Sequence, residues 1–92
     1  MKKAFVYILS NENRTAFYTG FTRDLAKRLI LHAKGGGARF TAKYKTFDLI
    51  YYEEFTTVSQ AMKREKQLKN WHRDWKLNLI KETNLNLKTL TF

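Results

Sequence analysis

The order of hydrophobic and polar positions along the chain predicts a small domain of mixed α and β structure. Segments rich in β-branched and aromatic side chains predict strands at residues 4–9, 15–21 and 48–55. Segments with apolar positions at helical spacing predict helices at residues 23–34, 57–70 and 73–82. The order β-β-α-β-α-α indicates an α+β fold, in which helices cover an antiparallel sheet and share one core with it.

Polar residues at the ends of these segments support the predicted boundaries. A polar cluster at residues 10–14 joins the first two strands and predicts a hairpin. Thr22 is suited to cap the first helix, and Gly35 is suited to end it in a left-handed conformation. Thr57 and Gln60 have the spacing of a capping box at the start of the second helix.

Length and composition limit the classes of protein that the chain can represent. Its 92 residues suit one domain, which we place at residues 1–83, with a C-terminal tail at residues 84–92. The chain has no cysteine, which excludes a disulfide scaffold, a thiolate zinc site and a cysteine nucleophile. The longest apolar run, at residues 4–9, is far shorter than the roughly 20 residues that span a bilayer. We therefore expect a cytoplasmic protein that does not enter a membrane.

Net charge indicates the kind of partner. The chain has 18 Lys and Arg against 8 Asp and Glu, a formal charge of +10. Such a charge favours polyanionic partners, of which nucleic acid is the commonest, whereas the alternative is a basic surface that is merely solvated. The segment at residues 39–45 alternates cations with aromatic side chains, a mixture that suits a phosphate backbone and unstacked bases.

The predicted hairpin brings two tyrosines together. If its turn is symmetric about Glu12 and Asn13, Tyr7 and Tyr18 lie directly opposite each other on one face of the sheet. Two cross-strand tyrosines are commonly a packing pair.

The first predicted helix carries an apolar stripe with two polar side chains at its edge. The apolar positions are Leu25, Ala26, Leu29, Ile30 and Ala33. Arg28 and His32, spaced i, i+4, share a face beside this stripe. Both can address one anion, since a guanidinium fork binds two phosphate oxygens and keeps its proton. The alternative is a surface arginine beside a half-buried histidine.

The second predicted helix places a carboxylate toward the core. At about 100° per residue, Glu65 falls in the middle of the stripe that includes Val58 and Met62. A lone carboxylate there is strongly disfavoured unless it is paired or binds a metal. Lys69 at i+4 offers an ordinary helix ion pair. Glu65 is therefore a candidate metal ligand or a carboxylate that faces Arg28, with a buried structural Arg–Glu pair as the alternative.

Four short motifs, in this order, resemble the pattern of GIY-YIG nucleases. They are Val6-Tyr7-Ile8, Phe17-Tyr18-Thr19-Gly20, Arg28 with His32, and Arg64-Glu65. The set spans about residues 4–82 and is most similar to the small stand-alone bacterial group, which resembles the nuclease domain of the excinuclease C subunit. The family fold, a three-stranded antiparallel sheet flanked by helices, agrees with the predicted order of elements.

The resemblance implies catalytic roles for residues of the first three motifs. Tyr7 matches the tyrosine that positions or activates the attacking water. Tyr18 matches the tyrosine near the scissile phosphate, and Gly20 matches the glycine of that motif. Arg28 matches the arginine that neutralises charge on the phosphate in the transition state, and His32 is a candidate proton shuttle. Which of Tyr7 and His32 takes the proton of the water stays open.

The resemblance also implies a metal and a substrate. Glu65 matches the carboxylate that binds a single divalent ion, Mg²⁺ or Mn²⁺, which would polarise the phosphate. Lys27, Arg39 and Lys43, together with Gly20, are the residues that we expect to contact the substrate. The implied activity is metal-dependent hydrolysis of DNA phosphodiester bonds, with structure-selective cleavage in repair or recombination as the expected context.

The motifs depart from the family pattern at several places. The first reads Phe5-Val6-Tyr7, without its glycine, and the second lacks its isoleucine, although neither change removes a reacting group. Asn70 and Asn78 are both candidates for an asparagine that larger members place after the glutamate. No DNA-recognition domain is evident in the sequence, so we expect specificity to be weak or to come from a protein partner.

Two other functions agree with the same residues. A nucleic-acid-binding module of this fold, with little or no turnover, would use the basic surface and pair Glu65 with Arg28. A protein-interaction domain would use exposed apolar side chains such as Leu31 and Trp71. Binding of DNA without metal-dependent cleavage would indicate the first, and a dimer or a co-purified partner the second.

Overall fold

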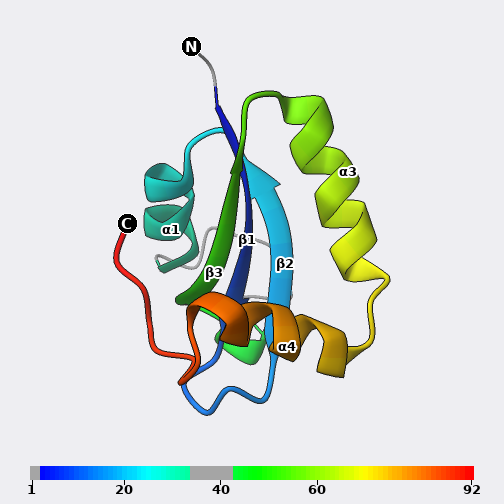
Figure 1. Cartoon of the computed structure of the whole chain (residues 1–92). Helices are drawn as coiled ribbons and strands as arrows, with labels where there is room; N and C mark the ends of the chain where they lie inside the picture. Colours follow the sequence, from blue (N-terminus) through cyan, green and yellow to red (C-terminus); the bar gives the residue numbers. More distant parts are fainter. Residues whose placement is uncertain (1–2, 34–42) are drawn as a thin grey trace.

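The structure confirms the predicted order of strands and helices. It is a computed structural model that describes residues 3–33 and 43–92 (Figure 1). The strands are β1 (Ala4–Ser10), β2 (Phe17–Thr22) and β3 (Asp48–Phe55). The helices are α1 (Leu25–Ala33), α3 (Val58–Lys69) and α4 (Arg73–Thr83). The fold is α+β, with a three-stranded antiparallel sheet flanked by helices.

The sheet has the strand order β2-β1-β3, so β1 is its central strand and β2 is at one edge. α1 packs against one face of the sheet, and α3 and α4 pack against the other (Figure 1). Every residue of β1 is buried. This explains the unbroken apolar run at residues 4–9, because a strand that is covered on both faces needs no polar alternation.

The hairpin register differs from the predicted one by two residues. Tyr7 lies opposite Gly20, so the expected direct pairing of Tyr7 with Tyr18 is wrong. The turn is organised by Asn11, whose Oδ1 accepts two backbone N–H groups at 2.8 and 3.0 Å, and by Arg14, which has a left-handed φ of 58°. Because a shift of two residues preserves the face of the sheet, Tyr7 and Tyr18 still lie on the same side.

Side chains cap the starts of α1 and α3. The predicted capping box is present at α3, where Thr57 and Gln60 exchange hydrogen bonds of 3.2 and 3.3 Å. At α1 the cap is Asp24 rather than Thr22, because Thr22 still belongs to β2 and Asp24 Oδ1 accepts the N–H three residues on, at 3.0 Å. Among the residues that the structure describes, every helix is too short or too polar to span a bilayer.

The tail at residues 84–92 packs back against the sheet. Asn84 is buried, and its Nδ2 donates to the carbonyl of Ile50 at 3.0 Å. The N–H of Leu90 donates to the carbonyl of Leu49 at 2.7 Å. The ring of Phe92 packs edge-on against aromatic side chains of β1 and β3. The tail therefore covers part of the face on which α1 lies.

Candidate functional site

The hydroxyl of Tyr7 is buried beside His32. Each side chain exposes only 1 % of its surface, and Tyr7 Oη lies 3.2 Å from His32 Nε2. Gly20, opposite Tyr7 in β2, makes room for this ring. A Cβ at Gly20 would lie 2.6 Å from Tyr7 Oη and 2.8 Å from its Cζ, which is too close for a rigid side chain. Close approach of the Tyr7 ring therefore explains the glycine at this position.

Tyr18 completes a cluster of three rings. Its ring centroid lies 6.3 Å from that of Tyr7 and 5.7 Å from that of His32. The rings of Tyr7 and His32 are 6.0 Å apart. The structure thus brings together three predicted site residues, one each from β1, β2 and α1.

The face of α1 that lies against the sheet includes polar side chains, so the predicted apolar stripe is wrong in part. Leu25 and His32 are its buried residues, and Arg28 and Leu29 are partly buried. The exposed members of the predicted stripe are Ala26, Ile30 and Ala33. His32 is therefore not a half-buried residue at the edge of the helix, and it fills a position in the core because Tyr7 supplies a polar partner there.

Burial, together with nearby charges, sets the protonation states of Tyr7 and His32. Burial raises the pKa of Tyr7 well above its ordinary value near 10; Tyr18 adds to this shift, Arg28 opposes it, and Glu65 raises the pKa further. The pKa of His32 is lowered, first by burial and then by the charge of Arg28. At neutral pH, Tyr7 therefore keeps its proton and His32 is uncharged. These shifts also show that Arg28 and Glu65 lie within electrostatic reach of the Tyr7 hydroxyl.

Glu65 lies at the border of the buried face of α3. That face is centred on Ala61 and Leu68, which are fully buried, whereas Met62 is 51 % exposed. Glu65 is roughly 50° from this centre at about 100° per residue, and its side chain is 19 % exposed. Glu65 is therefore on the core-facing side of the helix, as predicted, but at the border of the stripe and not in its middle. Its side chain is largely covered but not sealed from water.

The ion pair of Glu65 is with Lys69 on the same helix. Lys69 Nζ lies 3.5 Å from Glu65 Oε2 and 6.0 Å from the centroid of the Tyr18 ring. Within residues 3–33 and 43–92, no ion pair joins Glu65 to Arg28, so the direct pair considered from the sequence does not form. Glu65, Lys69 and Tyr18 thus form the side of the site at the β2 edge.

Glu65 suits a metal ion that takes few ligands from the protein. Among the described residues, no group of three or more His, Asp or Glu side chains is placed to hold a metal. Mg²⁺ commonly binds through one or two carboxylates and keeps waters or substrate phosphates as its other ligands, and Mn²⁺ prefers the same oxygen donors. One partly exposed carboxylate therefore fits either ion in the presence of a phosphate, but it does not fit a structural zinc site.

Arg64 anchors α3 to the sheet, a role that the sequence did not reveal. Its Nε and Nη2 each donate to a carboxylate oxygen of Glu53 at 2.9 Å, and the Tyr51 hydroxyl donates to the same carboxylate. Its guanidinium also lies 5.2 Å from the ring centroid of Trp71. Trp71 is partly buried, and it also lines a hollow together with the exposed ring of Trp75. In the sequence, the acidic residue Glu53 inside a predicted strand was the feature that could have indicated the contact with Arg64.

The predicted substrate contacts are only partly brought to the cluster: Gly20 lies against Tyr7, whereas the basic residues are placed as follows. Lys27 is exposed on α1, next to Arg28. Lys43 is exposed, and its Nζ lies 5.3 Å from the ring centroid of Tyr44. Arg39, like the end of the first helix predicted near Gly35, is outside the described residues.

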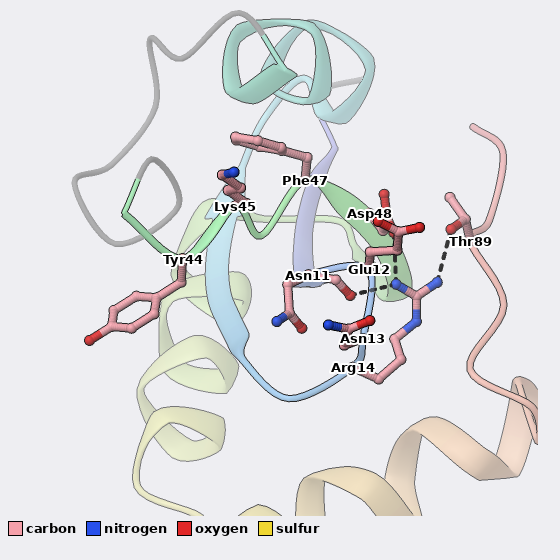
Figure 2. Close-up of a pocket in the computed structure, with 9 residues that line it drawn as sticks. All are labelled: Asn11, Glu12, Asn13, Arg14, Tyr44, Lys45, Phe47, Asp48 and Thr89. Carbon is pink, nitrogen blue, oxygen red and sulfur yellow. Dashed lines mark hydrogen bonds and ion pairs between the residues drawn. The ribbon is translucent and has the colours of Figure 1, made fainter.

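A hollow of about 690 Å³ at the hairpin turn is separate from this cluster (Figure 2). One side of it is filled by Arg14, which donates to the Asn11 carbonyl and to Asp48 Oδ2, both at 2.7 Å, and to Thr89 Oγ1 at 3.0 Å. These bonds join the turn to β3 and to the tail. None of the described residues that line the hollow belongs to the predicted catalytic set.

Comparison with known proteins agrees with this arrangement. The family described as the GIY-YIG catalytic domain matches residues 3–78. A UPF0213 protein of Staphylococcus epidermidis is 42 % identical over 82 residues, which cover 89 % of this chain and 99 % of that protein. A UPF0213 protein of Staphylococcus saprophyticus is 40 % identical over 82 residues, with the same coverage of both chains.

A solved structure shows the same fold. The solution NMR structure of a UPF0213 protein from Bacillus halodurans superposes with a TM-score of 0.57 at 32 % identity, covering 89 % of this chain and 86 % of that chain. The family match extends over the strands and helices that carry Tyr7, Tyr18, Arg28, His32 and Glu65. The chain therefore belongs to the GIY-YIG nuclease family, in the small stand-alone group of UPF0213 proteins.

Proposed function

We propose that this protein is a divalent-metal-dependent endonuclease that hydrolyses DNA phosphodiester bonds at the cluster around Tyr7. The observation that carries the proposal is the buried contact of 3.2 Å between Tyr7 Oη and His32 Nε2, with Arg28 and Glu65 acting on the same hydroxyl. Hydrolysis of a phosphodiester needs a proton acceptor, fixed positive charge and a metal ligand. His32, Arg28 and Glu65 supply these three functions around one hydroxyl.

His32 is the group suited to accept the proton of the attacking water. Its lowered pKa leaves the ring uncharged at neutral pH, whereas burial keeps Tyr7 protonated. Tyr7 acts as a relay: its hydroxyl gives its proton to His32 Nε2 as it takes one from the water, and the hydroxide attacks phosphorus. The step leaves Tyr7 unchanged and His32 as an imidazolium. It requires the resting His32 to carry its proton on Nδ1.

Arg28 and Tyr18 hold the phosphate in this proposal. Arg28 is partly buried, so its charge is less screened by salt than that of a fully exposed arginine. Its guanidinium can bind two phosphate oxygens and does not lose its proton. Tyr18 packs against His32 and offers a hydroxyl at the edge of the ring cluster. Positive charge that is fixed before the reaction stabilises the added negative charge of the transition state.

Glu65 is the residue that would hold Mg²⁺ or Mn²⁺. When bound, the ion neutralises charge on the phosphate and assists departure of the leaving oxygen. Lys69, 3.5 Å from the Glu65 carboxylate, competes with an ion for the same oxygens. Removal of the Lys69 charge should therefore strengthen metal binding, provided that the lysine does not itself contact the DNA.

DNA is the proposed substrate because the chain carries a charge of +10 and belongs to a nuclease family. Lys27, Arg39 and Lys43 would contact the phosphates on either side of the cleaved bond. We place the reaction in structure-selective DNA repair or recombination in the cytoplasm, with a partner protein adding sequence specificity. The charge and the family membership support DNA as the substrate.

A plasmid-nicking assay tests the proposed function. Purified protein is mixed with supercoiled plasmid in Mg²⁺, Mn²⁺ or EDTA, beside Glu65→Ala and the matched control Glu54→Ala. Glu54 lies opposite Phe5 in the sheet, and its carboxylate is paired with Lys3 at 3.4 Å, with both side chains about half exposed. It has no part in the proposed chemistry. Metal-dependent nicking that is lost only in Glu65→Ala supports the proposal. DNA binding without nicking by any protein would instead indicate a binding module of this fold.

A further inference from the structure

A second hollow, of about 350 Å³, lies at the start of β2 beside the first turns of α4. The residues that line it are Thr15, Ala16, Phe17, Tyr44, Arg73 and Lys76. Its volume is at the lower end of the about 300–1,000 Å³ that ligand pockets span. None of these residues takes part in the chemistry proposed above, so the hollow has no role in it.

The charged side chains that line this hollow are both basic. Arg73 is fixed by packing, because its guanidinium lies 4.9 Å from the centroid of the Phe17 ring and Nη2 donates to the Arg14 carbonyl at 3.3 Å. Lys76 is partly buried, and its pKa is lowered by burial and by the nearby charge of Lys69. Across the described residues, neither Arg73 nor Lys76 forms an ion pair. A phosphate that entered the hollow would therefore meet two cations that no carboxylate neutralises.

An aromatic ring lies on the outer side of the hollow. Tyr44 is 44 % exposed, and Figure 2 shows its ring turned away from Arg14 and the hairpin turn. Exposed aromatic rings beside cations are the surfaces on which proteins stack the bases of single-stranded nucleic acid. Tyr44 therefore supplies a stacking surface next to the cations that suit a phosphate.

The hollow is connected to the proposed active site along the β2 edge. Phe17 lines the hollow on the α4 face of the sheet, and the next residue, Tyr18, faces the ring cluster on the α1 face. The two places therefore lie on either side of the edge strand β2. Lys69 joins the two places, since it lies 6.0 Å from the Tyr18 ring and its charge lowers the pKa of Lys76. A nucleic-acid strand that runs along this edge can contact the hollow and the site together.

We propose that this hollow binds an unpaired nucleotide of the DNA substrate, with its phosphate on Arg73 and Lys76 and its base on the ring of Tyr44. The inference rests on the proposed nuclease function, whose substrate it narrows. Bases inside a duplex are stacked on their neighbours, so only an unpaired nucleotide presents a free face to an aromatic ring. The preferred substrate is then DNA with a single-stranded segment beside the cleaved bond, such as a flap or an overhang, rather than a continuous duplex.

The test compares the affinity for three labelled DNA hairpins: one blunt, one with a 5′ single-stranded extension and one with a 3′ single-stranded extension. Fluorescence anisotropy in EDTA and at constant salt measures binding without cleavage. We expect the full chain to bind one of the extended hairpins at least about 10-fold more tightly than the blunt one. Tyr44→Ala and Lys76→Gln should each reduce this preference by about 5-fold or more, since stacking and phosphate contacts are lost.

Two matched variants keep the test specific. Tyr44→Phe retains the stacking ring and should keep the preference, as should Lys81→Gln, which removes an exposed charge from the same helix. Equal affinity of the full chain for blunt and extended hairpins would overturn the proposal. The proposal would also be overturned if Tyr44→Ala and Lys76→Gln weakened binding of blunt and extended hairpins by the same factor, and by no more than Lys81→Gln does. If the wild-type chain prefers an extended hairpin but nicks DNA with neither Mg²⁺ nor Mn²⁺, the proposed nuclease activity is refuted and the nucleotide site is still supported.

Discussion

Tyr7 on β1 and His32 on α1 are joined by a buried contact of 3.2 Å between the tyrosine Oη and the imidazole Nε2. The two residues are 25 positions apart in the chain, so the contact fixes the first helix to the central strand. It also keeps an uncharged imidazole in an interior that disfavours its protonated form. The protonation of His32 is therefore linked to the stability of the fold.

Acidification should destabilise the protein through His32. Its pKa in the folded state is below the ordinary value of 6.5, whereas in the unfolded state it is not shifted. Below about pH 6.5 the unfolded chain binds more protons, so stability falls as the pH drops through this range toward the folded pKa. Melting temperatures measured from about pH 8 to pH 5 should fall more steeply for the wild type than for His32→Gln. His72→Gln, at an exposed histidine, should behave as the wild type, and identical curves for all three would contradict this link.

Gly20→Ala should destabilise the fold and displace Tyr7. The added Cβ would lie 2.6 Å from Tyr7 Oη and 2.8 Å from its Cζ, and the buried ring has no room to retreat. Overpacking of this kind costs about 1–3 kcal/mol in the free energy of unfolding. Urea denaturation measures the loss, and the same substitution in a Tyr7→Leu background, where the ring is gone, should cost much less. A penalty of the same size in both backgrounds would place the strain elsewhere.

Glu53→Gln should loosen the attachment of α3 to the sheet. It removes the charge that pairs with both donor nitrogens of Arg64, in a place where both side chains are largely buried. Hydrogen bonds to charged groups are worth about 1.5–3 kcal/mol, so we expect a loss of about 1–3 kcal/mol. The neighbouring Glu54→Gln is the matched control, because its ion pair with Lys3 is exposed and should contribute under about 1 kcal/mol. Equal effects at the two positions in urea denaturation would show that the Arg64 contact does not anchor the helix.

Asn84→Ala should release the tail at residues 84–92. The buried amide of Asn84 donates to the carbonyls of Ile50 and Lys88 and accepts the N–H of Lys88, at 2.8 to 3.0 Å. Loss of the amide leaves the buried carbonyl of Ile50 without its donor, which costs about 1–3 kcal/mol in the free energy of unfolding. The exposed Asn86→Ala should change stability by less than about 0.5 kcal/mol. Proteolysis of the tail that is equally fast in both variants would contradict this role for Asn84.

The strands and helices were predictable because each one is specified by nearby residues. Thr57 and Gln60 form the capping box that their spacing predicts, and the apolar run of β1 is buried on both faces. The register of the hairpin was not predictable from the assumption of a symmetric turn. It depends on how the side chain of Asn11 binds the backbone of the loop, which moves the pairing by two residues.

The sequence predicts a set of site residues, but it does not show how deeply each of them is buried. The apolar pattern of α1 favours Ile30 as a core residue, yet Ile30 is 57 % exposed and His32 takes the buried place. A polar residue can occupy a core position, against the hydrophobic pattern, where a polar partner lies opposite it. Here the partner of His32 is Tyr7, across the contact between α1 and β1. The pairing of Arg64 with Glu53 joins residues from α3 and β3, and only the tertiary packing shows it.

Single-turnover cleavage by Tyr7→Phe tests the proposed proton relay, because the substitution removes one oxygen atom from the middle of the site. The ring and its packing remain, so we expect the variant to fold with a loss of about 1 kcal/mol and to bind DNA as the wild type does. Cleavage in Mg²⁺ should fall by about 100-fold or more, since the relay to His32 Nε2 at 3.2 Å is broken. Cleavage at the wild-type rate by a folded Tyr7→Phe protein would contradict the account.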